Sequence, residues 1–209
     1  MREEGVRLSH LDEAGRVHMV DVSGKEPSVR VAVARGRVTM SRRTMDLIRQ
    51  AAVPKGDVLA VARVAGIMAA KEASRLIPLC HPLPLDHIQI DLRLRGGGGT
   101  RGSPEGRAQD RAEGGHEGGA QGSAEGWPEG GVEGGAEVLI QATVRTRAPT
   151  GAEMEALTGV MGAALAVYDM CKGVDRTMVI GDVRLVRKEG GRSGRWEREG
   201  EEPWLCSDE

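Results

Sequence analysis

Two segments of this chain alternate apolar and polar residues without interruption, and a glycine-rich stretch separates them. Residues 87–94 and 138–146 each place every second side chain on one apolar face, formed by Ile88, Ile90, Leu92 and Leu94 in the first and by Val138, Ile140, Ala142 and Val144 in the second. A period of two is typical of half-buried β-strands. The segments therefore predict two neighbouring strands with one face turned to a core.

The stretch between them is unlike the rest of the chain. Of the 41 residues at 96–136, 16 are glycine, in imperfect Glu-Gly-Gly-Ala repeats. So few apolar side chains do not offset the entropy lost on ordering, and we expect residues 96–136 to be a disordered insertion. Because closure entropy grows only logarithmically with loop length, a flexible insertion costs a strand pair little.

Periodicity and capping signals outline the remaining elements. We expect an extended segment at 29–40, a short helix capped by Ser41 and running through residue 52, and an alanine-rich helix capped by Asp57 and ending near 77. A further helix should run from Thr150 to about Lys172, followed by a strand at 178–188. The apolar stripe of that helix is formed by Met154, Leu157, Met161, Leu165 and Tyr168. The order β-α-β-β-α-β predicts a ferredoxin-like α+β fold, with an antiparallel sheet and helices packed on one face. We expect one domain over residues 1–209, with an acidic tail at 197–209.

Composition narrows the class of protein. Aromatic residues make up 2% of the chain and phenylalanine is absent, so the core must be aliphatic. No stretch reaches the ~18 apolar residues that a membrane helix needs, and the first residues do not resemble a signal peptide. The cysteines Cys80, Cys171 and Cys206 are odd in number and lack CxxC spacing. We therefore expect a cytoplasmic protein with reduced thiols and no membrane contact.

Charge is distributed unevenly. Residues 96–136 carry a net −4 and residues 197–209 a net −5, which leaves +7 on the other 155 residues of a chain with net charge −2. A basic body suits an anionic ligand.

The chain has 24 arginines and only five lysines, which are Lys25, Lys55, Lys71, Lys172 and Lys188. A lysine kept against this bias suggests a site needing a compact charge or an ammonium that loses its proton, although chance retention on the surface is the competing interpretation.

Asp169 and Lys172 are spaced i, i+3 and should be neighbours on a helix. They could form a surface ion pair of little consequence, or a buried pair that serves as general base and general acid. Glu153 follows Thr150 by three residues, as in a capping box that stabilises the helix start.

Glu155 has no such structural explanation. On an unbroken helix it would lie on the same side as Asp169 but about 21 Å away along the axis. Three arrangements remain open. The ligand is long, the helix breaks near Gly159 or Gly162, or two subunits build each site.

Cys80 and His81 lie next to each other between Leu79 and Pro82. Sequence neighbours rarely reach the geometry of a nucleophile and its base. A zinc site would need further suitably spaced ligands, which the sequence does not offer. We interpret Cys80 as structural and His81 as an anion-binding residue, and we predict no metal site.

Several short blocks in order then resemble the cyclic pyranopterin monophosphate synthase family. They are His-Met-Val-Asp-Val-Ser at 18–23, Lys-Gly-Asp-Val at 55–58, Ala-Gly-Ile at 65–67, Leu-Ile-Pro-Leu-Cys-His-Pro-Leu at 76–83, Gly-Ala-Glu-Met-Glu-Ala-Leu at 151–157, Tyr-Asp-Met-Cys-Lys at 168–172 and Val-Arg-Leu at 183–185, followed by a Gly-Gly-basic-Ser-Gly loop. The resemblance covers almost the whole chain outside the insertion and the tail.

The resemblance implies a ferredoxin-like homo-hexamer, a trimer of dimers with active sites at subunit contacts. It implies a small-molecule, GTP-derived substrate, 3′,8-cyclo-7,8-dihydroguanosine 5′-triphosphate, which is converted to cyclic pyranopterin monophosphate and pyrophosphate in molybdenum cofactor biosynthesis. Asp169 and Lys172 match the catalytic residues. The substrate-binding positions match Leu79, Cys80, His81, Glu153, Met154, Glu155, Lys55, Lys71 and Lys188. No organic cofactor is expected, while a divalent cation on the pyrophosphate stays open.

One position departs from the family, since Arg192 stands where the last loop commonly has lysine. Arginine serves there if the position only binds phosphate.

Two other functions are alternatives to that of a synthase. A ferredoxin-like RNA-binding module would stack bases on aromatic side chains, which the expected strands lack, and no nucleic-acid partner is expected. A non-catalytic regulator that binds a pterin or nucleotide would not need an intact Asp169 and Lys172.

Overall fold

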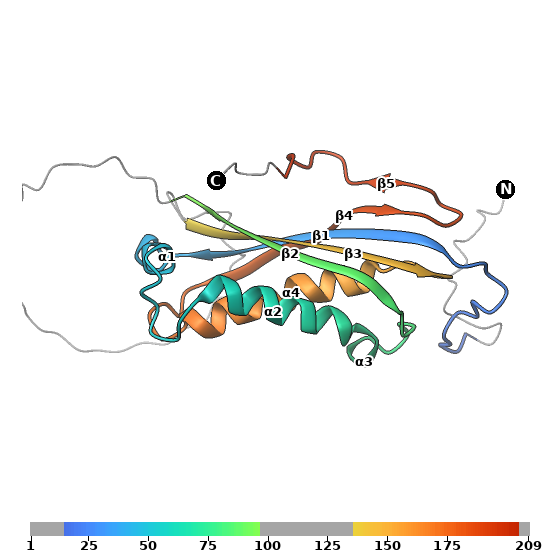
Figure 1. Ribbon diagram of the computed structural model, residues 1–209, viewed down its shortest axis with the longest axis horizontal. Coiled ribbons are helices and arrows are strands. Elements are labelled where there is room, and N and C mark those ends of the chain that lie inside the picture. Colours follow the sequence, from blue (N-terminus) through green and yellow to red (C-terminus); the bar gives the residue numbers. More distant parts are fainter. Residues whose placement is uncertain (1–14, 97–135, 205–209) are drawn as a thin grey trace, which may run out of the picture.

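The computed structural model describes residues 15–96 and 136–204 of the chain. Within them, the elements are β1 (Ser28–Met40), α1 (Arg42–Arg49), α2 (Val58–Lys71), α3 (Ala73–Leu76), β2 (Leu85–Arg95), β3 (Ala136–Ala148), α4 (Glu153–Cys171), β4 (Val179–Glu189) and β5 (Trp196–Glu197). The strands form one sheet in the order β2-β3-β1-β4-β5, and all neighbours run antiparallel. The long helices α2 and α4 cover one face of this sheet (Figure 1). The predicted β-α-β-β-α-β order and fold class are confirmed.

The two alternating segments pair with each other as expected. Leu94 lies opposite Val138, and Ile90 lies opposite Ala142. Ile90 and Ile140 are almost fully buried on the helix side, as the alternation requires. The glycine-rich insertion connects these two strands. Its predicted disorder concerns residues outside the described ones, except for its two ends.

Both predicted helix caps on the N-terminal half are present. The Ser41 hydroxyl accepts a hydrogen bond from the Thr44 amide at 3.2 Å, and Asp57 accepts one from the Ala60 amide at 3.0 Å. The helix expected to run to residue 77 is interrupted, because Glu72 leaves helical geometry between α2 and α3. The first helix ends at Arg49 rather than at residue 52, and Ala51 takes a positive φ of 50°.

The start of the last helix corrects the capping-box prediction. α4 begins at Glu153, and its N-cap residue Ala152 makes no side-chain capping hydrogen bond. The Glu153 carboxylate instead lies 3.7 Å from the Lys188 ammonium on β4. Glu153 therefore belongs to a polar cluster beside the helix start rather than to a cap formed with Thr150.

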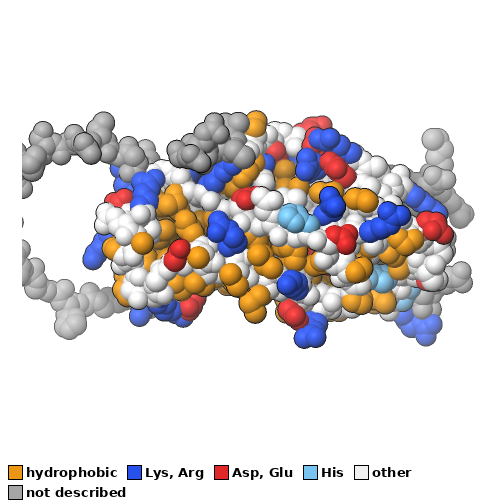
Figure 2. Space-filling view, viewed as in Figure 1, with side chains coloured by type: hydrophobic (Ala, Val, Ile, Leu, Met, Phe, Trp, Pro, Cys, Tyr) orange, Lys and Arg blue, Asp and Glu red, His pale blue; other side chains and the backbone are white. Residues whose placement is uncertain are grey.

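The predicted apolar stripe of α4 does not form its core face. The fully buried side chains of this helix are small, and include Ala156, Val160, Ala163, Ala164 and Val167. The larger Met161 and Leu165 are 38% and 56% exposed. Figure 2 shows hydrophobic side chains on the surface over the helical layer. The size of the side chains, and not only their hydrophobicity, decides which face meets the core.

Close packing between α2 and α4 explains this choice. A β-carbon added to Gly66 would lie 2.9 Å from the Gly159 carbonyl oxygen, and one added to Gly162 would lie 2.3 Å from the Ala69 β-carbon. Large side chains at this crossing would hold the helices apart. α4 runs unbroken through both of its glycines, so a broken helix no longer accounts for the spacing of Glu155 and Asp169.

α4 is also long and apolar enough, by length and composition, to cross a membrane, yet half of that stretch is buried inside the fold. Its buried residues belong to the hydrophobic core, which the aliphatic strands complete. Among the described residues, no tryptophan belongs to this core, and Tyr168 packs at its margin.

The sequence did not predict β5, which pairs with the end of β4 through Arg187–Glu197 and Lys188–Trp196. β5 carries an exposed tryptophan, so the expected absence of aromatic residues from the sheet holds for β1 to β4 only. Residues 198–204 of the acidic tail follow β5 and lie on the side of the sheet opposite the helices (Figure 1).

Candidate active site

Three of the predicted site residues meet at the C-terminal end of α4. The Asp169 carboxylate lies 2.7 Å from the Lys172 ammonium and 2.8 Å from the Lys55 ammonium. Lys55 also donates a hydrogen bond to the Asp169 backbone carbonyl at 2.8 Å. Asp169 and Lys172 lie one helical turn apart, while Lys55 comes from the loop before α2. We call these three residues the Asp169 cluster.

The cluster is charged and accessible. Its side chains are between 46% and 56% exposed, so the buried acid–base pair considered from the sequence is not present within a single chain. The pKa of Asp169 is lowered to about 2, first by the hydrogen bond from Lys172 and then by that from Lys55. The carboxylate is therefore ionised at neutral pH but weakly basic. If an anionic ligand drew either lysine away, the basicity of the Asp169 carboxylate would rise.

A buried carboxylate fixes the chain directly after the cluster. Asp175 accepts hydrogen bonds from the Ser41 amide at 2.9 Å, from the Thr44 hydroxyl at 3.0 Å and from the Thr177 amide at 2.9 Å. These bonds tie the turn that follows α4 to the start of α1. The cluster therefore projects from a rigid end of the fold, as a site that positions protons requires.

The other predicted residues gather at the opposite end of α4. A hollow of about 450 Å³ is lined by Leu79, Cys80, His81, Glu153 and Met154, together with Val20, Val22, Lys25, Thr150 and Gly151. We call it the His81 hollow. The loop after α3 supplies Leu79, Cys80 and His81, and the start of α4 supplies Glu153 and Met154. The structure therefore brings five of the predicted binding residues together here.

Glu155 lies behind this hollow and is almost fully buried at 3% exposure. Cys80 donates a hydrogen bond from its thiol to one Glu155 carboxylate oxygen at 3.5 Å, and the other oxygen is buried without a partner among the described residues. Burial raises the pKa of Glu155. Burial, followed by the nearby Glu155 charge, raises the pKa of Cys80 to about 11. A thiol so held is not a nucleophile at neutral pH, which agrees with a structural role for Cys80.

A second hollow of about 300 Å³ adjoins the first and shares Lys25, Thr150, Gly151 and Glu153 with it. Its other lining residues include Arg30, Lys188, Arg192 and Ser193. We call it the Lys188 hollow. Four cationic side chains thus face two carboxylates, Glu153 and Glu189, and such an excess of positive charge suits a polyphosphate.

Sequence reasoning missed two members of this second group. Lys25 was the lysine left outside the matched positions, and Arg30 was one of many arginines. Lys25 lines both hollows, and Arg30 lines the Lys188 hollow while its side chain bonds the carbonyls of Ala148 and Pro149. The scarcity of lysine was the signal that could have found Lys25.

The structure does not bring all predicted residues to one place. The Asp169 cluster and the two hollows lie at opposite ends of α4, which spans Glu153–Cys171. Lys71 is the exposed last residue of α2 and lines neither hollow. Within residues 15–96 and 136–204, no group of three or more His, Cys, Asp and Glu side chains is placed to hold a metal ion.

Comparison with known proteins gives a single result over nearly all of the chain. Residues 19–191 match the model of the MoaC family. The chain is 50% identical over 197 residues to the cyclic pyranopterin monophosphate synthase of Pelotomaculum thermopropionicum, with 94% of each chain covered. It is 49% identical over 187 residues to that of Roseiflexus sp. (strain RS-1), with 90% of this chain and 95% of the relative covered. By both measures, the chain belongs to the MoaC family.

Proposed function

We propose that this chain is a cyclic pyranopterin monophosphate synthase, a lyase of molybdenum cofactor biosynthesis. It would convert 3′,8-cyclo-7,8-dihydroguanosine 5′-triphosphate to cyclic pyranopterin monophosphate and pyrophosphate. The observation that carries the proposal is the Asp169 cluster, in which one carboxylate holds two ammonium groups within 2.8 Å. The names of relatives that are about half identical to the chain support the same reaction.

The reaction asks for groups that this cluster offers. Protons must move while the five-membered ring derived from guanine opens and the pterin ring closes. Lys172 is the proton donor in our proposal, and Asp169 accepts a proton once the substrate draws a lysine away. A hydroxyl then attacks the α-phosphate, and the P–O bond to the leaving pyrophosphate breaks.

The hollows at the other end of α4 suit the anionic part of the substrate. Lys25, Arg30, His81, Lys188 and Arg192 surround them. Fixed cations neutralise the negative charge that collects on a leaving pyrophosphate. The chain itself would thus supply the binding and proton-transfer groups without a resident organic cofactor, and a divalent cation on the pyrophosphate is compatible with this arrangement.

A complete site requires two subunits in this proposal. The Asp169 cluster and the two hollows are separated by most of α4, which rises about 1.5 Å per residue and so spans about 20 Å between them. Exposed apolar side chains on the two long helices favour a contact between copies, and they are Val61, Val64, Met68, Met161 and Leu165. A two-fold axis through such a contact would bring opposite ends of two chains together. We propose a hexamer formed as a trimer of dimers, in a cytoplasm that keeps Cys80 and Cys171 as free thiols.

The direct test supplies the cyclised dihydro-GTP to the purified chain. Pyrophosphate should be released in step with an oxidised pterin that is identified by chromatography and mass. Release of pyrophosphate without the pterin, or no turnover by the correctly assembled protein, would refute the assignment.

Mixing two inactive variants tests the shared site. Asp169→Asn removes the carboxylate of the Asp169 cluster, and His81→Ala alters the His81 hollow at the other end of α4. Each variant alone should be inactive. In a mixed dimer with shared sites, one site would carry both substitutions and the other neither, so random reassembly should restore about a quarter of wild-type turnover. If each site lay within one chain, the mixture would stay inactive. Light scattering on each variant checks that assembly is intact.

A further inference from the structure

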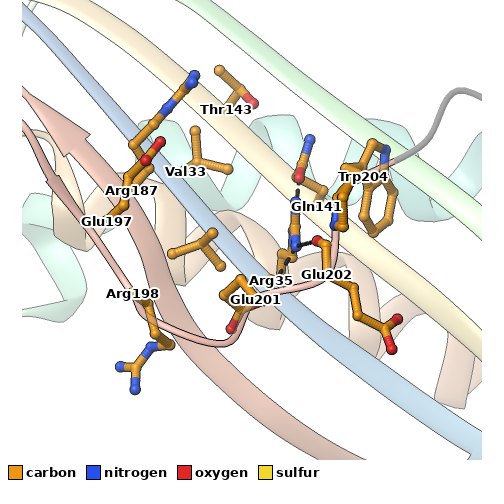
Figure 3. A pocket seen from close by; sticks show the side chains of 12 residues that line it. Val33, Arg35, Gln141, Thr143, Arg187, Glu197, Arg198, Glu201, Glu202 and Trp204 are labelled. Carbon is orange, nitrogen blue, oxygen red and sulfur yellow. Dashed lines mark hydrogen bonds and ion pairs between the residues drawn. The ribbon is translucent and has the colours of Figure 1, made fainter.

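The segment after β5 crosses the face of the sheet opposite the helices, and its acidic residues are not simply solvated there. The Arg198 amide donates a hydrogen bond to the Val186 carbonyl at 2.8 Å, and the Arg198 side chain donates another to the Leu185 carbonyl at 2.9 Å. These bonds keep the segment beside β4. Figure 3 shows it passing over the side chains of β1 and β3, where it encloses a pocket of about 370 Å³.

Glu201 is the most firmly held residue of the segment. Its side chain is only 11% exposed and lies between Arg184 of β4 and Arg35 of β1. Arg184 donates to both carboxylate oxygens, with one contact at 2.8 Å, and Arg35 donates to one of them at 3.1 Å. Such a two-pronged guanidinium–carboxylate contact is among the stronger and more directional ion pairs in proteins.

The next residues extend the same attachment. The Glu202 carbonyl accepts a hydrogen bond from Arg35 at 2.7 Å. The Trp204 ring lies 4.3 Å from the Arg93 guanidinium and 5.3 Å from that of Arg35, both within the range of cation–π attraction. Residues 201–204 thus contact strands β1, β2 and β4. We call these four residues the tail anchor.

The β5 side of the hairpin that the anchor follows has little to hold it by itself. β4 belongs to the main sheet, where Lys188 and Glu189 pair with Ala32 and Val31 of β1. β5 has only two residues, both of them exposed, and so short a pairing is marginally stable without further packing. One of the two pairs in this hairpin is Lys188–Trp196, so the residue that lines the Lys188 hollow is itself part of it.

The hairpin loop supplies further lining residues of that hollow. It includes Arg192 and Ser193, and Ser193 accepts a hydrogen bond from Lys188 at 3.3 Å. Gly190 opens the loop with a φ of 97°, and an added β-carbon there would lie 2.2 Å from the Val29 carbonyl oxygen. The first residues of the loop therefore pack directly against the start of β1, and Arg192 and Ser193 follow them on the side that leads to β5.

We propose that the tail anchor holds β5 and the end of the hairpin loop in place and thereby sets Arg192, and through Ser193 the Lys188 ammonium, for the polyphosphate of the substrate. Glu201 is the positioning residue of this anchor and does not touch the substrate. The inference rests on the proposed function, because it assigns the Lys188 hollow to phosphate.

The test compares Glu201→Gln and Trp204→Ala with the control Glu199→Gln, which changes an exposed acid of the same segment. Hydrogen exchange is measured over residues 190–197, binding of inorganic tripolyphosphate by calorimetry, and KM and kcat by pyrophosphate release. For Glu201→Gln we expect the hydrogen-exchange rate, the tripolyphosphate Kd and KM each to rise about tenfold, with little change in kcat. A tenfold change is the effect expected from the loss of a charged hydrogen bond. Trp204→Ala should act in the same direction, and Glu199→Gln should match the wild type.

Two results would overturn the inference. Unchanged exchange in residues 190–197 of Glu201→Gln would mean that the anchor does not hold the hairpin. Faster exchange with an unchanged tripolyphosphate Kd would mean that the hairpin does not position the phosphate-binding residues. Exchange and tripolyphosphate binding need no turnover. If Glu201→Gln shows both effects while the wild-type protein forms no pterin, only the proposed reaction is refuted.

Discussion

Replacing Gly162 by alanine should destabilise the fold, although alanine is the better helix former. Gly162 lies inside α4 where it crosses α2. The added β-carbon would lie 2.3 Å from the Ala69 β-carbon and 3.1 Å from the Ala65 carbonyl oxygen. Neither neighbour is the end of a flexible side chain, so relief requires the two helices to move apart.

Two opposing terms set the size of the effect. Alanine gains about 1 kcal/mol over glycine in a helix interior. Overpacking a core costs about 1–3 kcal/mol, and a contact this far inside the ~3.5–4.0 Å carbon–carbon optimum belongs at the upper end. The expected net loss in the free energy of unfolding is therefore about 1–2 kcal/mol. A chain of this size should then lose about 2–4 °C in Tm for each kcal/mol.

Chemical denaturation at fixed protein concentration measures this loss, with a rescue and a control. Ala69→Gly removes the clashing atom, so the double variant Ala69→Gly/Gly162→Ala should recover about 1–2 kcal/mol beyond the sum of the single effects. Gly173→Ala is the control, because an added β-carbon there meets nothing within 4 Å. Additive single effects, or a Gly162→Ala protein as stable as the wild type, would show that the helix crossing is not packed as described.

Three further substitutions or measurements test the site. Asp169→Asn keeps the shape of the side chain but removes its charge, and single-turnover pyrophosphate release should fall by ~10²–10⁴ while assembly stays intact; turnover within a few-fold of wild type would make Asp169 structural. Lys172→Arg keeps the charge but not the ability to give up a proton, so it should fail as badly as Lys172→Ala in the same assay, and a working Lys172→Arg enzyme would limit the position to charge alone. Alkylation of Cys80 by iodoacetamide should be slow at pH 8 and accelerate about tenfold per pH unit toward its pKa of about 11, whereas a rate that levels off below pH 9 would contradict the half-buried thiol beside Glu155.

The architecture was predictable where the sequence pattern has one physical meaning. Strict alternation in β2 and β3 fixed both the strands and their buried face, since a one-residue slip would turn every apolar side chain to the solvent. Ser41 and Asp57 marked helix starts because their side chains bond free amides. The order of these elements then left few ways to form one sheet.

The face of α4 was not predictable in the same way. Its sequence offers two overlapping stripes, one of large apolar side chains and one of glycine, alanine and valine. Hydrophobicity favours the first, but close approach of α2 requires the second, and α2 is a partner that the sequence of α4 does not reveal. The large Leu165 is therefore exposed in the single chain.

The site was predictable in its residues but not in its assembly. The i, i+3 spacing predicted the Asp169–Lys172 contact, which is present. Lys55 joins it from 114 residues away in sequence, a contact that only the tertiary fold creates. For Glu153 the local pattern predicted a contact that is absent. The sequence has a capping motif there, but the Glu153 carboxylate lies beside Lys188 on the distant strand β4.

The aliphatic core has a consequence for how this protein can be observed. Among the described residues, the only tryptophans are Trp196, which is 40% exposed on β5, and Trp204, which stacks on arginines across the sheet. In a Trp127→Phe variant, indole fluorescence would therefore report on the hairpin and the tail, while far-ultraviolet circular dichroism would follow the helices. A melt read by fluorescence should come before one read by dichroism. Such a mismatch between probes usually signals a folding intermediate, but here it would record the tail leaving an intact core.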